Sequence, residues 1–277
     1  MKISAYAKLN LCLDITGRRE DGYHLLDMVM QEIDLFDELE IVKAEDITVS
    51  CDVSLPKRNT VYVAAEKFFE YTGIKGGAHI TLKKHIPEQA GLGGGSSDAA
   101  AVISALSSIY DAGLSESALS EIASFVGSDV PFFIKGSSQR VMGIGEIVIP
   151  VKNNISCFYV LAKPKKGVST AEAYKKYHET QNDKINVDAV IAALEKGDIG
   201  SFAKNTGNVL QKAALLITNE VAEVLSLLAD ADHSMMTGSG SCVFGMYENK
   251  NAAEAAFERI QKNSTVDFCC ICQGKSR

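Results

Sequence analysis

Alternating apolar and polar residues predict that the chain begins with a strand. Every second residue from Ala5 to Ile15 is apolar, and Lys8 and Asn10 lie between them. Since successive side chains of a strand point to opposite faces, the pattern predicts a half-buried strand on which Lys8 and Asn10 point the same way. Taken alone, this segment favours a solvated polar face for both side chains.

The rest of the first half shows strand and helix patterns in turn. A charged, glycine-containing turn at residues 17–24 precedes strand patterns at Met28–Leu35, Asp37–Val49 and Ile80–Leu82. Helical spacing of apolar residues predicts helices at Asn59–Tyr71, Ala99–Ile109 and Ala118–Phe125. The polar stretch at residues 151–154 marks the predicted boundary between two domains, residues 1–151 and 152–277.

The second half continues this alternation of elements. Strand patterns lie at Cys157–Ala162 and Val266–Cys272, and helical patterns lie at Thr170–Tyr177, Val187–Leu194, Asn219–Leu228 and Ala252–Ile260. Alternating strands and helices of this kind predict a two-layer α+β domain, for which a ferredoxin-like arrangement is one solution.

Residues 91–98 form a glycine-rich turn that opens directly onto the apolar helix pattern at Ala99–Ile109. Their sequence is Gly-Leu-Gly-Gly-Gly-Ser-Ser-Asp, and Ser96, Ser97 and Asp98 are residue types that cap helix starts. The turn leaves backbone N–H groups unpaired, and the helix behind it adds the positive end of its dipole. The segment therefore predicts a phosphate-binding loop.

Two common phosphate-binding motifs do not match this turn. A P-loop needs a lysine after the glycines, and the dinucleotide fingerprint needs a glycine where Ser96 stands. A flexible turn in front of a capped helix remains the alternative. Lys83, Lys84 and His85 precede the turn and fit nucleotide binding, although charged residues in a loop are more often solvated.

Composition narrows the class of protein. The chain has 277 residues, 46% of them hydrophobic, and a net charge of −7, so sequence-independent binding to nucleic acid or a membrane surface is not expected. It shows no apolar run of membrane-spanning length and no signal peptide, which predicts a cytoplasmic protein. Among the seven cysteines, Cys269, Cys270 and Cys272 cluster in a strand pattern, which favours reduced, buried thiols over a metal site.

Two further motifs have more than one interpretation. Asp129 stands two residues before Pro131 and suits the N-cap of a helix. Residues 237–241, Thr-Gly-Ser-Gly-Ser, form a second glycine-rich turn before an apolar run. A hairpin between strands explains this turn as well as a ligand contact does.

Five motifs in this order resemble the GHMP kinase superfamily. They are Ala-Lys-Leu-Asn at residues 7–10, Asp-Gly-Tyr-His at 21–24, the glycine-rich turn with two alanines at 91–100, Gly-Ser-Asp-Val-Pro-Phe-Phe at 127–133 and Thr-Gly-Ser-Gly-Ser-Cys-Val-Phe at 237–244. The first two motifs are most similar to the diphosphocytidyl branch of the superfamily. The resemblance runs from residue 5 to about residue 245.

The resemblance implies an α+β GHMP kinase fold and a kinase activity. The expected N-terminal domain is of the type of the second domain of ribosomal protein S5, the expected C-terminal domain is ferredoxin-like, and the active site lies between them. The implied reaction transfers the γ-phosphate of ATP to the 2-hydroxyl of a cytidine-diphosphate-linked methylerythritol. ATP and Mg²⁺ are expected, although no acidic residue stands out as a metal ligand, and the chain is expected to be a monomer or a weak homodimer.

Site residues carried over from the family fall on positions that match its motifs. The catalytic pair is Lys8 and Asp129, with Asp129 as the base that accepts the hydroxyl proton and Lys8 keeping it ionised. The ATP-binding residues are Asn59, Lys84, Gly91, Leu92, Gly93, Gly94, Gly95, Ser96 and Ser97. The substrate-binding residues are Asn10, Tyr23, His24 and Tyr174, with Tyr23 stacking on the cytosine and His24 hydrogen-bonding it.

Two other functions compete with this prediction. A GHMP kinase that acts on another alcohol, such as mevalonate or homoserine, would use the same pair of catalytic residues. A nucleotide-binding sensor without turnover would not need a base, so the presence of both Lys8 and Asp129 counts against it.

Overall fold

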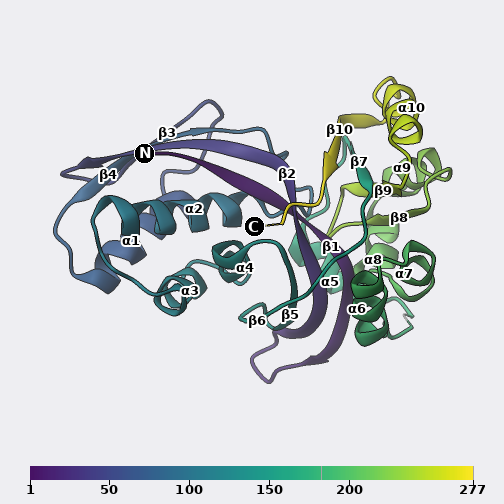
Figure 1. Ribbon diagram of the computed structural model, residues 1–277, viewed down its shortest axis with the longest axis horizontal. Coiled ribbons are helices and arrows are strands. Elements are labelled where there is room, and N and C mark those ends of the chain that lie inside the picture. Colours follow the sequence, from purple (N-terminus) through teal and green to yellow (C-terminus); the bar gives the residue numbers. More distant parts are fainter. Residues whose placement is uncertain (182, 277) are drawn as a thin grey trace.

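Two β-sheets and the helices that pack on them make up the computed structural model, which describes residues 1–181 and 183–276 (Figure 1). The long antiparallel strands β1 (Lys2–Arg18) and β2 (His24–Ala44) run across the first sheet and reach toward the second. They pair from Lys2 opposite Glu40 to Arg18 opposite His24. The two strand patterns predicted at Met28–Leu35 and Asp37–Val49 thus belong largely to one strand.

β1 is buried on both faces, so the solvated polar face expected for Lys8 and Asn10 is wrong. Lys8 is 2% exposed and Asn10 is 1% exposed. The glycine-rich turn covers the strand at Lys8, whose N–H donates to the carbonyl of Leu92 at 3.0 Å, and the second half of the chain covers it at Asn10. Alternation of apolar and polar residues predicts which side chains share a face of the strand, but it does not predict what packs against each face.

The first sheet has the strand order β3-β4-β2-β5-β6, with β1 beside β2. Its shorter strands are β3 (Thr48–Cys51), β4 (Gly77–Lys83), β5 (Ser138–Gly143) and β6 (Ile147–Pro150). Four helices belong to this half: α1 (Thr60–Thr72), α2 (Gly94–Ile109), α3 (Glu116–Ser124) and α4 (Val130–Lys135). The central helix α2 packs against β1, β2 and the other three helices, and it carries much of the apolar core of this half.

The second sheet is antiparallel, with the strand order β10-β7-β9-β8. Its strands are β7 (Phe158–Pro164), β8 (His233–Met236), β9 (Val243–Tyr247) and β10 (Val266–Gln273). Its helices are α5 (Thr170–Tyr177), α6 (Val187–Lys196), α7 (Ile199–Asn205), α8 (Leu210–Ile217), α9 (Glu220–Leu227) and α10 (Lys250–Ile260). Helices separate β7 from β8 and β9 from β10, which is the β-α-β-β-α-β order of the predicted ferredoxin-like arrangement.

The end of the chain returns from the second sheet to the first (Figure 1). After β10 it pairs with β2, where the Lys275 N–H donates to the carbonyl of Glu32 at 2.8 Å. The predicted boundary at residues 151 and 152 falls between the last strand of the first sheet and the first strand of the second. As a boundary between units that fold separately it stays a prediction.

Candidate active site

A cavity of about 1250 Å³ lies where the two halves of the chain meet. Its walls come from β1 and β2, from the residues before α1, from the glycine loop (residues 91–97), from the start of α4, from α5 and from the second glycine loop (residues 237–241). Most of the predicted site residues line it: Lys8, Asn10, Tyr23, His24, Asn59, Lys84, Gly91, Leu92, Gly93, Gly94, Gly95, Asp129 and Tyr174. Ser96 and Ser97 follow directly inside α2.

The glycine loop turns into helix α2 earlier than the sequence suggested. α2 begins at Gly94, with Gly93 at the N-cap in the left-handed conformation and no side chain capping it. The expectation that Ser96, Ser97 and Asp98 cap the helix is therefore wrong, because all three lie within its first turns. The first backbone N–H groups of α2 have no intrahelical acceptor and form the positive end of the dipole of this 16-residue helix, which suits a phosphate group.

Glycine is required in this loop because the chain approaches two neighbours closely. A Cβ at Gly91 would lie 2.2 Å from the carbonyl oxygen of Thr237, and one at Gly93 would lie 2.8 Å from the Phe133 ring. Both glycines have positive φ, a conformation that residues with a side chain rarely adopt. The loop is therefore held in place by packing on both sides and not merely by its own flexibility.

Lys84 lies beside the glycine loop in a buried ion cluster. Its Nζ donates to Asp98 Oδ2 at 2.7 Å and to Asp37. Burial lowers the pKa of Lys84, but the two carboxylates outweigh it and the pKa is raised. Burial also raises the pKa of Asp98 to about 7, against the pull of Lys84. The predicted role of Lys84 as an ATP contact stays a prediction, since its ammonium group already has two anionic partners.

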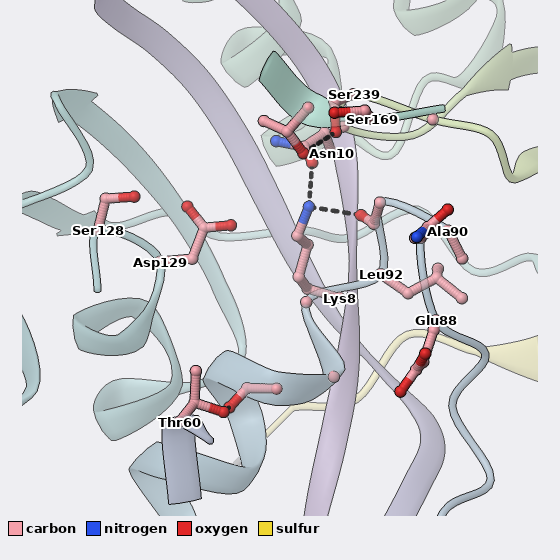
Figure 2. Close-up of a pocket in the computed structure, with 18 of the residues that line it drawn as sticks. Lys8, Asn10, Thr60, Glu88, Ala90, Leu92, Ser128, Asp129, Ser169 and Ser239 are labelled. Carbon is pink, nitrogen blue, oxygen red and sulfur yellow. Dashed lines mark hydrogen bonds between the residues drawn. The ribbon is translucent and has the colours of Figure 1, made fainter. Parts of the chain in front are cut away.

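Lys8 is a buried lysine that lines the cavity, and Figure 2 shows it between Asp129 and Leu92. Its Nζ donates to Asn10 Oδ1 at 2.5 Å and to the carbonyl oxygen of Gly91 at 2.6 Å. Burial lowers the pKa of Lys8, while the charge of Asp129 works to raise it. The pairing of β1 with β2 shifts register on both sides of this segment, between Tyr6 and Lys8 and between Asn10 and Cys12. Such β-bulges change the direction in which side chains point.

Asp129 stands at the N-cap position of α4, but its side chain makes no capping hydrogen bond. In Figure 2 its carboxylate lies on the side of Lys8 opposite the residues of the glycine loop. Its charge acts on Lys8 and on Tyr174, whose pKa is raised by burial and further by Asp129. The position predicted from the proline is correct, whereas the capping function is wrong, and the carboxylate is left free to act in the cavity.

Asn59 serves the structure of α1 as well as lining the cavity. Its Oδ1 accepts a hydrogen bond from the Tyr62 N–H at 3.0 Å as the N-cap of the helix, and its Nδ2 donates to the carbonyl of Pro56 at 3.1 Å. The predicted contact of Asn59 with the nucleotide stays a prediction, because both ends of its amide already have partners.

At the other end of the cavity, aromatic rings from β2 and α5 meet. His24 stacks on Tyr174 with ring centroids 4.9 Å apart and an angle of 23° between the planes. Tyr23 lines the cavity but is 62% exposed. His178 was not predicted from the sequence as a neighbour of this site, and its Nε2 lies 3.3 Å from Nε2 of His24. Burial lowers the pKa of His24, and His178 and Arg18 lower it further.

The second glycine loop is a hairpin connection, and the ligand contact that the sequence left open for it stays a prediction. It connects β8 to β9, which pair as an antiparallel hairpin, and its residues 238–240 line the cavity. Thr237 was missed as a site residue: its Oγ1 accepts the N–H of Asn10 at 2.9 Å. Ser239 Oγ lies 2.8 Å from Thr170 Oγ1 at the start of α5. The loop thus touches both the residues around Lys8 and the helix that carries Tyr174.

Metal-binding side chains are not gathered in the described residues. Within residues 1–181 and 183–276, no group of three or more His, Cys, Asp or Glu side chains could hold an ion. Cys269, Cys270 and Cys272 lie on β10 as predicted, with unpaired thiols, but only Cys272 is buried, whereas Cys269 and Cys270 are partly exposed. None of the helices in this part of the chain has the length and apolar character needed to cross a bilayer.

Family models and curated relatives both match this chain. The models for the N-terminal and C-terminal domains of GHMP kinases match residues 59–137 and 190–265. A 4-diphosphocytidyl-2-C-methyl-D-erythritol kinase of Caldicellulosiruptor bescii is 40% identical over 270 residues, which are 94% of each chain. The enzyme of the same name from Geobacillus thermodenitrificans is 38% identical over 269 residues, 94% of this chain and 93% of its own.

Solved structures give the same result for the fold. A crystal structure of 4-(cytidine 5'-diphospho)-2C-methyl-D-erythritol kinase, 32% identical, superposes with a TM-score of 0.83 over 99% of this chain and 100% of its own. A homoserine kinase from Cytophaga hutchinsonii is 17% identical and superposes with a TM-score of 0.78 over 99% of this chain and 94% of its own. The second likeness shows the fold alone, and it confirms the fold class predicted from the motifs.

Proposed function

This chain belongs to the GHMP kinases and, within them, to the family of 4-diphosphocytidyl-2-C-methyl-D-erythritol kinases, and from this premise we propose that it phosphorylates the 2-hydroxyl of 4-diphosphocytidyl-2-C-methyl-D-erythritol with ATP. The main structural support is the position of Lys8. A buried ammonium group stands between a helix start that suits phosphate and a carboxylate that is free to accept a proton.

Asp129 is the base in the proposed reaction. The substrate hydroxyl gives its proton to the Asp129 carboxylate as its oxygen forms a bond to the γ-phosphorus of ATP. The bond between that phosphorus and the oxygen bridging to the β-phosphate breaks, and ADP leaves with the electron pair. Asp129 is half-buried and its side chain makes no hydrogen bond that caps α4, so the carboxylate is open to the substrate hydroxyl.

Lys8 and the glycine loop stabilise the negative charge on the transferred group. Lys8 is fixed by two hydrogen bonds to neutral acceptors, so its positive charge stays available to the phosphoryl oxygens. The N–H groups at the start of α2 hold the preceding phosphates. Mg²⁺ would be bound to the nucleotide as part of the substrate, where it would neutralise phosphate charge. The described side chains do not form a ligand cluster for it, so we assign it no protein ligands.

We propose that the base of the substrate binds at the aromatic end of the cavity. The His24 ring, stacked on Tyr174, hydrogen-bonds the cytosine in this proposal. The Tyr174 ring stacks on the base, which gains on the order of 1 kcal/mol or more. Tyr23, exposed at the rim, is free to close on the other face of the base. Asn10 holds Lys8 and lines the cavity next to the proposed position of the methylerythritol.

Steady-state release of ADP tests the proposal. The purified chain is given ATP with the diphosphocytidyl substrate, with mevalonate or with homoserine, each at equal concentration. The proposal predicts turnover with the first acceptor at least 100-fold above that with either of the others. Turnover that is fastest with mevalonate or homoserine, or ADP release that no alcohol stimulates, contradicts it.

A further inference from the structure

Asn208 lies between α7 and α8, outside the residues that line the cavity. Its segment is bonded to β1: the Leu13 N–H donates to the carbonyl of Gly207 at 2.9 Å, and the Val209 N–H donates to the carbonyl of Leu13 at 3.0 Å. Asn208 itself is 8% exposed. Its side chain is therefore fixed relative to the strand that carries Lys8.

The amide group of Asn208 binds the second glycine loop at two points. Its Nδ2 donates to the carbonyl oxygens of Met236 and Gly238, each at 2.8 Å. Its Oδ1 accepts the Leu210 N–H at 2.9 Å, so both ends of the amide have partners. These two carbonyls lie on either side of Thr237, and the amide therefore sets the position of that residue.

Thr237 and Gly238 pack directly against the groups that bind Lys8. Gly91, whose carbonyl oxygen accepts from Lys8 Nζ, lies so close to Thr237 that a Cβ there would be 2.2 Å from the Thr237 oxygen. Asn10, the other acceptor of Lys8, donates its N–H to Thr237 Oγ1 at 2.9 Å. A shift of the loop thus moves Asn10 and Gly91 together.

We propose that Asn208 is a positioning residue for Lys8. By holding the carbonyls of Met236 and Gly238 it fixes the second glycine loop, and the loop fixes the two acceptors that orient the ammonium group. Lys8 acts on charge that develops during phosphoryl transfer, so misplacing it lowers kcat more than it lowers substrate binding. The kinetic part of this inference rests on the proposed function, whereas the placement of Lys8 does not.

The substitution Asn208→Asp tests this role. It keeps the shape and the acceptor for the Leu210 N–H, but it replaces the donor with an anion that repels both carbonyls. Asn205→Asp is the matched control, because Asn205 is an exposed residue at the end of α7 whose amide donates to the carbonyl of Ser201. We expect kcat to fall about 10- to 100-fold in Asn208→Asp with both KM values within twofold, and to stay unchanged in Asn205→Asp.

Chemical labelling of Lys8 provides a second readout that needs no substrate. The rate of acetylation by acetic anhydride, measured by mass spectrometry, should rise at least threefold for Lys8 in Asn208→Asp. Lys84, buried in its own ion cluster, serves as the internal reference and should not change. If the wild-type chain shows no turnover, the proposed function fails, while the labelling still decides the placement of Lys8.

Three results would overturn the inference. They are a folded Asn208→Asp variant with wild-type kcat, a rise in KM without a fall in kcat, and unchanged labelling of Lys8. Should Asn208→Asp not fold, Thr237→Val decides, because it keeps the shape of Thr237 and removes the acceptor of the Asn10 N–H. A normal kcat in Thr237→Val would contradict the inference, and a fall of about tenfold or more with KM unchanged would support it.

Discussion

The end of the cavity at the glycine loop is formed by the main chain and buried charges, whereas the end at His24 is formed by side chains that are partly open to solvent. At the first end, helix N–H groups and the Lys84 cluster are fixed by packing before any ligand arrives. At the second end, the side chains of Tyr23 and His178 are exposed to solvent. The difference indicates a rigid site for phosphate and an adaptable site for the base.

Asp129→Asn gives the largest expected effect, because it removes the proposed base, on which the reaction depends at whichever end of the cavity a ligand binds. The amide is almost the same size as the carboxylate but cannot accept the hydroxyl proton, so kcat should fall about 100-fold or more. ATP affinity, measured by calorimetry, should stay within threefold of wild type. A variant that retains near-normal kcat would show that Asp129 is not the base.

Gly94→Val breaks the phosphate end alone. A Cβ at Gly94 would lie 3.1 Å from Cγ2 of Ile86 and 3.4 Å from Nζ of Lys84, and the branched side chain adds bulk at the start of α2. ATP affinity should fall about tenfold, equivalent to about 1.4 kcal/mol, while the cytidine substrate binds as before. Titration of each ligand measures this, and equal weakening of both would indicate a disturbed fold instead.

Removing a ring breaks the base end alone. Tyr174→Ala deletes the stacking partner of His24, and His24→Ala deletes the hydrogen-bonding ring. Each should raise KM for the cytidine substrate about five- to tenfold and leave KM for ATP unchanged, as expected for a loss near 1 kcal/mol. Tyr23→Phe keeps its ring and is the control that should be tolerated. A matching rise in KM for ATP would contradict the division of the cavity into two ends.

The smallest expected effect concerns pH. The pKa of His24 is lowered by burial, by His178 and by Arg18, so its neutral form persists below the ordinary value of 6.5. KM for the cytidine substrate should therefore stay flat as pH falls to about 6.5 and rise only below it. His178→Gln removes one lowering influence and should move this rise toward higher pH. A rise that begins at the same pH in both proteins would rule out the influence of His178.

The phosphate end of the cavity could be predicted from the sequence better than the contacts between distant segments. The phosphate loop depends on residues that are adjacent in the chain, so its glycines and the helix behind it were recognisable. The helix start was misplaced because Gly94 and Gly95 have low helix propensity, and packing around them overrides it. The expected capping by Asp129 is wrong for a related reason. The proline two residues later predicts that Asp129 stands at the N-cap position, but it does not predict the partner of the Asp129 side chain.

Contacts between distant segments could not be predicted. Lys84 meets Asp37 47 residues away and Asp98 14 residues away, and no local pattern distinguishes these charges from solvated ones. His24 and His178 are 154 residues apart. Burial of Lys8 was missed likewise, since the groups that cover β1 come from the glycine loop and from the second half of the chain.

The central claim is that the chain transfers one phosphate from ATP to the 2-hydroxyl of a cytidine-linked substrate. The most direct test is a ³¹P NMR spectrum of the product formed from ATP and 4-diphosphocytidyl-2-C-methyl-D-erythritol, run beside the uridine analogue and an alcohol without a nucleobase. We predict one new phosphomonoester resonance whose integral matches the ADP formed, and no coupling to a proton, because the carbon that carries the accepting hydroxyl bears no hydrogen. The other two acceptors should be converted poorly. Equally efficient phosphorylation of the alcohol without a nucleobase, or a product phosphorylated at another hydroxyl, would contradict the account.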